Sequence, residues 1–324
     1  NMGVEFNLFD IADVQVEYFT ENRLKIYMAR QDLPPSMGLA SGVSIYGNLG
    51  EVKSSGIDAS VDIKKYINKD LFVTGRFNFT YAHGEYKVAS EPAYENTPWR
   101  SKVGYPVTQT WGYIAERLFI DAADVANSPT QSFGTTQAGD IKYKDINNDG
   151  KISEDDLVPI GYPTTPEINY GFGFSVGWKG WDLSAFFQGQ DRVSFIINAG
   201  AIAPFTGYRN AMQAIADDHW SPNNPVSDTF WPRLSAGSNA NNTQTSTWWL
   251  RNGRLVRLKT LEFGYSIEHS GILKKTPFKV CRIYFSGSNL FKISKFDMWD
   301  PEMGRNGLAY PLQRVFSIGL QLTL

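Results

Sequence analysis

The segment 313–324 constrains the fold of this chain more than any other. Its apolar side chains alternate with small or polar ones, and successive side chains of a strand point to opposite faces. One face carries Phe316, Ile318, Leu320, Leu322 and Leu324. A strand of a soluble sandwich shows the same alternation, but chain ends are ordinarily polar and frayed. This ending is expected of a lipid-facing strand that closes a β-barrel, because closure removes the sheet edge and the bilayer covers the apolar row.

Alternating segments of the same kind recur along the chain between turn residues, which is a strand signal. The clearest is 170–178, where aromatic and aliphatic side chains oppose Gly171, Gly173, Ser175 and Gly177. The other expected strands are 4–8, 14–18, 57–63, 71–81, 181–187, 261–267 and 278–285. These segments predict an all-β protein with about ten visible strands, more than the eight or so that already close a small barrel.

The connections between the strands alternate strictly in length. Short turns are expected near 10–13, 67–70, 179–180 and 268–277, and long connections near 22–53, 85–166, 189–253 and 289–312. Outer-membrane barrels have short periplasmic turns and longer external loops. The pattern therefore predicts a transmembrane antiparallel β-barrel with long external loops and its C-terminus at the periplasmic end.

Composition agrees with this class and excludes others. The chain contains 9 Trp, 16 Tyr and 21 Phe, as expected for strands and for interfacial aromatic belts. No apolar run reaches the roughly 18 residues that a membrane helix needs. A net charge of -2 gives no basic field for nucleic acid. The single Cys281 excludes an intramolecular disulfide framework, and we expect it to face lipid.

Short segments along nearly the whole chain resemble, in the same order, the C-terminal third of SusC/RagA-type TonB-dependent outer-membrane transporters of the Bacteroidetes group. The matching segments are 48–52 with 56–57, 139–143, 219–225, 249–253, 257–259, 288–291, 300–302 and 310–312. The resemblance implies that residues 1–324 are the C-terminal part of a barrel of about 22 strands. Since an open barrel would leave bare strand edges in lipid, we expect the N-terminal barrel and plug region to complete it.

The resemblance also implies a function, a location and partners. Such transporters lie in the bacterial outer membrane as multi-pass barrels, take up glycans or peptides as oligosaccharide or peptide substrates, and receive energy through TonB. A SusD-like surface lipoprotein covers their external face. TonB would contact the N-terminal region, and outer-membrane lipid would surround the barrel.

An acidic segment, 140–158, resembles a calcium loop inside an external connection. Oxygen-bearing side chains occupy loop positions 1, 3, 5, 9 and 12, Gly150 occupies position 6, and a backbone carbonyl serves position 7. The expected ligands of a structural Ca²⁺ are Asp145, Asn147, Asp149, Lys151 through its carbonyl, Ser153 and Asp156. An Asx-rich turn without an ion is the alternative.

Four tryptophans of the external connections are candidates for stacking on sugar rings. They are Trp220, Trp231, Trp248 and Trp249. Packing within the loops or in an interfacial belt is the alternative, and the stronger one. Trp178 and Trp181 flank a short turn and are expected in the periplasmic aromatic girdle.

No enzyme signature is present. His83, His219 and His269 are scattered, and the sequence lacks an HExxH motif and a nucleophile elbow. Glu262 and Glu116 near Arg117 are the acidic residues considered for a glycosidase pair. Two alternatives to the importer stay open: a secreted soluble β-sandwich that binds polysaccharide, and a passive porin-like channel.

Overall fold

The computed structural model describes residues 1–38, 42–268, 274–305 and 307–324. Most of its strand residues belong to one antiparallel sheet of nine strands. These strands are β1 (Met2–Leu8), β2 (Ala12–Ala29), β3 (Tyr46–Tyr66), β4 (Leu71–Val88), β11 (Ile168–Trp178), β12 (Trp181–Asp191), β15 (Leu255–Glu268), β16 (Val280–Ser294) and β17 (Val315–Thr323). We call this sheet the wall.

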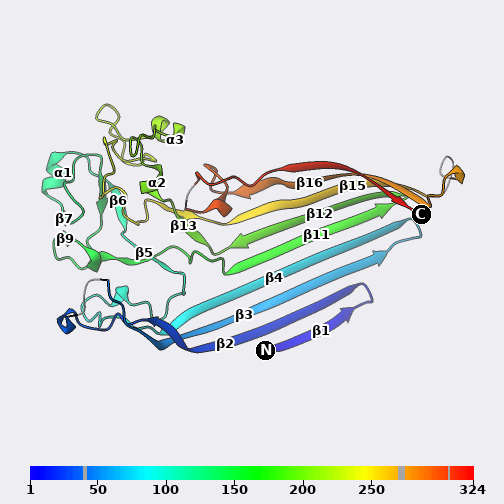
Figure 1. Ribbon diagram of the computed structural model, residues 1–324, viewed down its shortest axis with the longest axis horizontal. Helices are drawn as coiled ribbons and strands as arrows, with labels where there is room; N and C mark the ends of the chain where they lie inside the picture. Colours follow the sequence, from blue (N-terminus) through cyan, green and yellow to red (C-terminus); the bar gives the residue numbers. More distant parts are fainter. Residues whose placement is uncertain (39–41, 269–273, 306) are drawn as a thin grey trace.

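Each wall strand pairs with the next wall strand along the chain, so the sheet is a continuous meander (Figure 1). Its outer members, β1 and β17, do not pair with each other within the described residues. The prediction of about ten strands was close to the nine observed. The antiparallel all-β class is confirmed, and the described residues form an open sheet.

The strict alternation of connections is also present. Short turns join β1 to β2, β3 to β4 and β11 to β12 at one end of the wall, where the C-terminus also lies (Figure 1). The turn expected near Gly271 and His269 falls outside the described residues. The long connections gather at the opposite end.

The first long connection was predicted wrongly, because it covers 30–45 and not 22–53. Both flanking strands continue past their apolar stretches. Glu21 pairs with Ser54 and Asn22 with Lys53 across β2 and β3. Ladder hydrogen bonds join backbone groups whatever the side chains are, so these polar strand ends carry no hydrophobic alternation that the sequence could reveal.

The two faces of the wall differ in chemistry along entire rows of cross-strand partners. One row is apolar over eight neighbouring strands and consists of Phe6, Val14, Val61, Phe77, Phe172, Phe187, Leu258 and Phe291. A row on the other face consists of Lys64, Thr74, Ser175, Ser184, Glu262, Ser286 and Ser317. The expected division of Phe172 and Phe174 from Gly173 and Ser175 is therefore observed.

Within the described residues, nothing covers the apolar face of the wall. Phe174 is 43% exposed and Ile318 is 84% exposed. The remaining strands of the described residues form four two-stranded sheets, none of which is large enough to cover the wall. A soluble sandwich buries such a face against a second sheet, so the sandwich alternative lacks its second layer.

Among the described residues, no helix is long and apolar enough to span a membrane.

The long connections 89–167, 192–254 and 295–314 fold together into a second region, which we call the cap. Its short strands are β5 (Thr110–Gly112), β6 (Ala115–Leu118), β7 (Thr130–Gln131), β8 (Ile141–Tyr143), β9 (Lys151–Ile152), β10 (Val158–Ile160), β13 (Ser194–Ile196) and β14 (Leu250–Asn252). Its helices are α1 (Ala122–Ala126), α2 (Ala199–Ile202) and α3 (Gln213–Asp217), with 3₁₀ turns η2 (Pro98–Arg100), η3 (Glu154–Asp156) and η5 (Pro301–Met303). The 3₁₀ turn η1 (Pro35–Met37) lies in the separate connection 30–45.

The hydrophobic core of the chain lies in the cap and not in the wall. It joins buried residues from all three long connections, among them Tyr113, Ile141, Phe195, Trp249 and Trp299. Buried polar side chains hold these segments together. Gln131 donates to the Ile141 carbonyl at 2.9 Å, and Asp140, which is fully buried, accepts from Asn242 at 2.8 Å.

Candidate functional site

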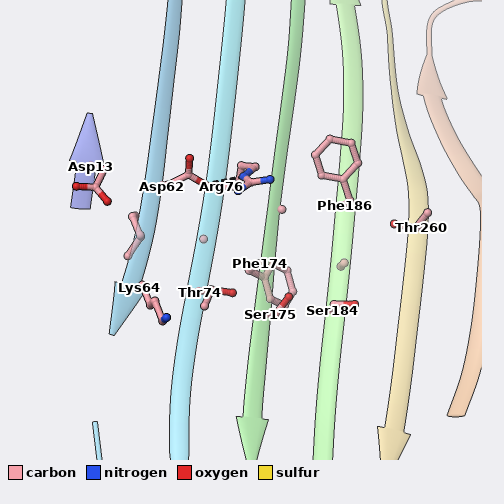
Figure 2. Close-up of a pocket in the computed structure, with 14 residues that line it drawn as sticks. Asp13, Asp62, Lys64, Thr74, Arg76, Phe174, Ser175, Ser184, Phe186 and Thr260 are labelled. Atoms are coloured by element: carbon pink, nitrogen blue, oxygen red, sulfur yellow. Dashed lines mark hydrogen bonds and ion pairs between the residues drawn. The ribbon is translucent and has the colours of Figure 1, made fainter. Parts of the chain in front are cut away.

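The polar face of the wall carries a groove of about 750 Å³ that crosses several strands (Figure 2). Small residues make room for it, including Gly173, Ser175 and Ser184. Phe186 is an aromatic residue on this face, and its ring fills the space where a side chain at Gly173 would lie, 2.9 Å from the ideal Cβ position. The groove presents hydroxyls and charges beside the Phe186 ring.

Ion pairs organise the charges on this face. Arg76 donates from Nε to Asp62 at 2.5 Å, as Figure 2 shows. Arg282 donates to Asp182 at 3.0 Å and to Glu262 at 2.6 Å. The Arg282–Asp182 ion pair lies over Gly264, where a Cβ would be only 2.7 Å from the Asp182 carboxylate. The wall strands thus position fixed charges in a polar, solvent-accessible surface.

The structure places the two acidic residues considered for a glycosidase pair in different regions, and two of the scattered histidines have structural contacts. Glu262 pairs with Arg282 on the wall, while Glu116 lies on β6 in the cap. His83 is hydrogen-bonded to Glu167, and His219 contacts the Ile215 carbonyl at 3.1 Å. These contacts bring no nucleophile and base together.

The segment 140–158 adopts a compact loop in which Asp145 organises the backbone. Its two carboxylate oxygens accept from the Asn148 and Gly150 N–H groups at 2.7 and 2.8 Å. Asn148 and Gly150 have φ values of 59° and 81°, a region in which glycine is at ease. Asp149 accepts from the Lys151 N–H at 2.8 Å.

The far end of the same loop is closed by Asp156, which is fully buried. Its carboxylate accepts from the Ile146 and Ser153 N–H groups at 2.7 and 2.8 Å. Ser153 caps the turn η3 in a reciprocal capping box with Asp156. Positions 2, 9 and 12 of the expected calcium loop are therefore tied together directly.

The carbonyls on either side of position 7 are held by the neighbouring strand β7. The Gly150 and Ile152 carbonyls accept from Thr130 and Ser132 at 3.1 Å each, which directs them toward β7. Because carbonyls alternate along an extended segment, the Lys151 carbonyl points away from β7. Within the described part of the chain, however, no three His, Cys, Asp or Glu side chains converge on one point.

The four tryptophans that were considered for sugar stacking belong to the cap core. Trp249 is fully buried, donates from Nε1 to the Asn242 carbonyl at 2.8 Å, and lies 5.0 Å from the Trp231 ring. Trp248 is half-buried and donates to the Phe230 carbonyl at 3.2 Å. Burial of these rings supports the packing alternative.

Trp220 keeps contact with a surface cavity of about 390 Å³, although it is only 8% exposed. Its ring covers Gly139, where an ideal Cβ would lie 2.2 Å from the ring and where φ is 81°. Glycine is therefore required at position 139 for the tryptophan to seat.

A second cap cavity, of about 220 Å³, was not anticipated from the sequence. Arg251 of β14 lines it, and burial lowers the pKa of this guanidinium. Segment 249–253 is one of the segments that carry the family resemblance. Nothing in its residue pattern, however, indicates that Arg251 is half-buried beside a cavity.

No family model matches the chain. TonB-dependent receptor P3 of Formosa agariphila is 24% identical over 99% of this chain and 33% of its own length. TonB-dependent receptor P26 of the same organism is 31% identical over 57% of the chain and 20% of its own length. TonB-dependent receptor SusC of Bacteroides thetaiotaomicron is 20% identical over 85% of the chain and 27% of its own length.

Solved structures show the same fold. The structure of the RagAB peptide transporter matches with a TM-score of 0.72 and 24% identity, over 99% of this chain and 34% of the matched chain. The RagAB peptide importer in its closed-closed state matches with a TM-score of 0.69. The chain spans about a third of the length of the first relative and of these structures. The relatives are named as receptors and importers and not as enzymes.

Proposed function

We propose, on the premise that this chain is a portion of a SusC/RagA-type TonB-dependent transporter, that it forms part of the wall and external cap of an outer-membrane nutrient importer. The observation that carries the proposal is the division of the wall into an uncovered apolar face and a grooved polar face. A barrel wall between lipid and an aqueous lumen needs this division.

The proposal includes partners that lie outside this chain. The N-terminal part of the transporter would complete the barrel and supply the plug, and TonB would deliver energy through it. A SusD-like lipoprotein would cover the cap, and the cargo would be a glycan or a peptide. The peptide importer among the structural neighbours supports the second cargo class.

The test uses the full-length transporter in cells from which its gene has been deleted. Restored uptake of labelled oligomers that stops when a protonophore is added supports the importer. Uptake that continues unchanged without the proton gradient contradicts it and favours the passive channel. A tag in the short turn 67–70 should also recover the lipoprotein from detergent extracts, since that turn lies opposite the cap.

We also propose that the loop 140–158 holds a structural Ca²⁺ through Asp145, Asn147, Asp149, the Lys151 carbonyl, Ser153 and Asp156. The support is the loop spacing, the outward Lys151 carbonyl and the glycine at the sharp turn. Carboxylate oxygens that accept one N–H keep lone pairs for a metal. The ion would cross-link like charges that otherwise repel one another within this loop.

Replacing both Asp145 and Asp149 by Ala should abolish calcium-dependent protection of amides 140–160 from hydrogen exchange, while the wall strands stay protected. Glu154→Ala is the matched control, because Glu154 lies in the same loop at a position that supplies no ligand. Equal protection in the wild type with calcium and with a chelator would favour the Asx-turn alternative.

A further inference from the structure

The cap cavity beside Arg251 lies where two wall strands pass into the cap. β14 carries Arg251 and pairs with β13, which follows β12, while the segment 295–298 follows β16 directly. The cavity has a volume of about 220 Å³ and is lined by Phe230, Arg251, Asn252, Lys295, Phe296, Asp297 and Met298. At about 30 Å³ for each water, the cavity has room for roughly one amino-acid residue.

Arg251 uses only part of its hydrogen-bonding capacity within the chain. Its Nη1 donates to the carbonyls of Trp248 and Leu250 at 2.8 and 2.9 Å. A guanidinium has five N–H donors, so the three on Nε and Nη2 remain. Neither of these nitrogens is buried without a partner, which leaves the Nε–Nη2 edge accessible. This edge is the fork that binds a carboxylate through two parallel hydrogen bonds.

The charge of Arg251 is not balanced by the chain itself. Among the described residues, no carboxylate lies within ion-pair distance of Arg251, whereas Arg257 nearby in the sequence pairs with both Asp300 and Glu302. Burial lowers the pKa of the Arg251 guanidinium. A cation that has lost part of its hydration gains more from an added anion than a fully solvated one does.

The other lining residues indicate which chemical group would carry an anion bound to Arg251. Lys295 is exposed, forms no ion pair with a described residue, and adds a second cation. Asp297 is the acidic residue of the lining, so two cations and one acid leave a charge of +1. Phe230, Phe296 and Met298 supply an apolar wall. The cavity therefore combines a carboxylate fork with space for one apolar side chain.

We propose that this cavity binds the C-terminal residue of a peptide, with its carboxylate on Arg251 and Lys295 and its apolar side chain against Phe230, Phe296 and Met298. The inference rests on the proposed import function and names its substrate class. An acidic sugar shares the carboxylate but presents hydroxyls to the apolar wall, where they would lose hydrogen bonds to water.

The experiment measures binding to the purified full-length transporter by fluorescence anisotropy. Three probes carry the same dye: the peptide Ala-Ala-Ala-Phe with a free carboxylate, the same peptide amidated, and a tetragalacturonate. We expect the free peptide to bind about tenfold or more tightly than the amide, as the loss of one charge-assisted pair predicts. The uronate should bind no better than the amide.

Variants locate the effect in this cavity. Lys295→Glu changes an exposed side chain and should remove the preference for the free carboxylate without affecting the fold. Arg251→Gln should do the same, with hydrogen exchange checking that β13 and β14 remain paired. Lys69→Glu, an exposed charge reversal in a short wall turn, is the control and should leave the preference intact.

The outcomes separate this inference from the proposed function. Equal binding of free and amidated peptides, or a preference that survives both cavity variants, overturns the carboxylate site even if energised uptake is normal. Tight uronate binding that depends on Arg251 overturns the peptide assignment. Loss of energised uptake with every cargo would instead contradict the importer itself.

Discussion

The wall and the cap bury their apolar side chains in different ways. The wall places Phe174, Phe263 and Ile318 on a face that the chain leaves exposed, whereas the cap encloses Ile141, Ile152 and Trp249 almost completely. The cap has a water-excluding core of the ordinary globular kind. The described residues of the wall form no such core cluster, and many of the wall's apolar side chains are exposed. The two regions therefore differ in where their apolar side chains lie: inside the protein in the cap, and on an exposed face in the wall.

The strongest test of whether the cap and the wall are independent is to remove the side chain at the centre of the cap core. Trp249→Ala deletes a fully buried ring and its hydrogen bond to Asn242, and it should cost about 3–5 kcal/mol. Hydrogen exchange on the full-length transporter should show lost protection across the cap and unchanged protection in the wall. Trp178→Ala is the matched control, since Trp178 is 53% exposed beside a short turn. Coupled loss of both regions would show that they are one cooperative unit.

The second test distinguishes the two faces of the wall. Lys at Phe174 places a charge on the uncovered apolar face and should cost about 2–4 kcal/mol near the middle of a bilayer, whereas Lys at Ser175 should be much milder. Folding into lipid vesicles, followed by the shift in electrophoretic mobility of the folded form, measures the difference. Equal tolerance at the two positions would mean that the apolar face does not lie against lipid.

The wall could be predicted from the sequence because its rule is local. Alternation with period 2 in 170–178 assigns Phe172 and Gly173 to opposite faces without any knowledge of their neighbours. The rule failed at the end of β2, where Glu21 and Asn22 pair with β3 although neither face is apolar. Alternation therefore reveals the part of a strand that has one apolar face. It misses the part that continues the strand with polar residues on both faces.

The cap could not be predicted in the same way, because its contacts join residues far apart in the sequence. Asn241 accepts from Gln131 at 2.6 Å and donates to the Ile141 carbonyl at 2.9 Å. Such side-chain hydrogen bonds replace the regular ladders that create periodic patterns. The calcium-like spacing of 145–156 was visible, since a loop motif is local, but the burial of Trp249 and the accessible edge of Arg251 were not.

The mildest test concerns a charged side chain that stabilises the cap. Asp124 at the start of α1 accepts from Arg117 at 2.9 Å, from the Ile120 N–H at 3.0 Å and from Lys142 at 3.2 Å. The hydrogen bond from Arg117 is the main reason why the pKa of Asp124 lies well below its ordinary value of 3.8, against the opposing effect of burial.

A carboxyl whose folded-state pKa is depressed stabilises the fold above its unfolded-state pKa, and that stabilisation is lost as the pH falls toward the folded-state value. Between pH 6 and pH 3 the cap segment 117–128 should therefore lose about 1 kcal/mol of protection, after correction for intrinsic exchange rates. Asp124→Asn should show the weakened protection already at pH 6 and little further change. If the wild type and this variant lost protection in parallel on acidification, another group would control the pH dependence, and the cap would not owe this part of its stability to Asp124.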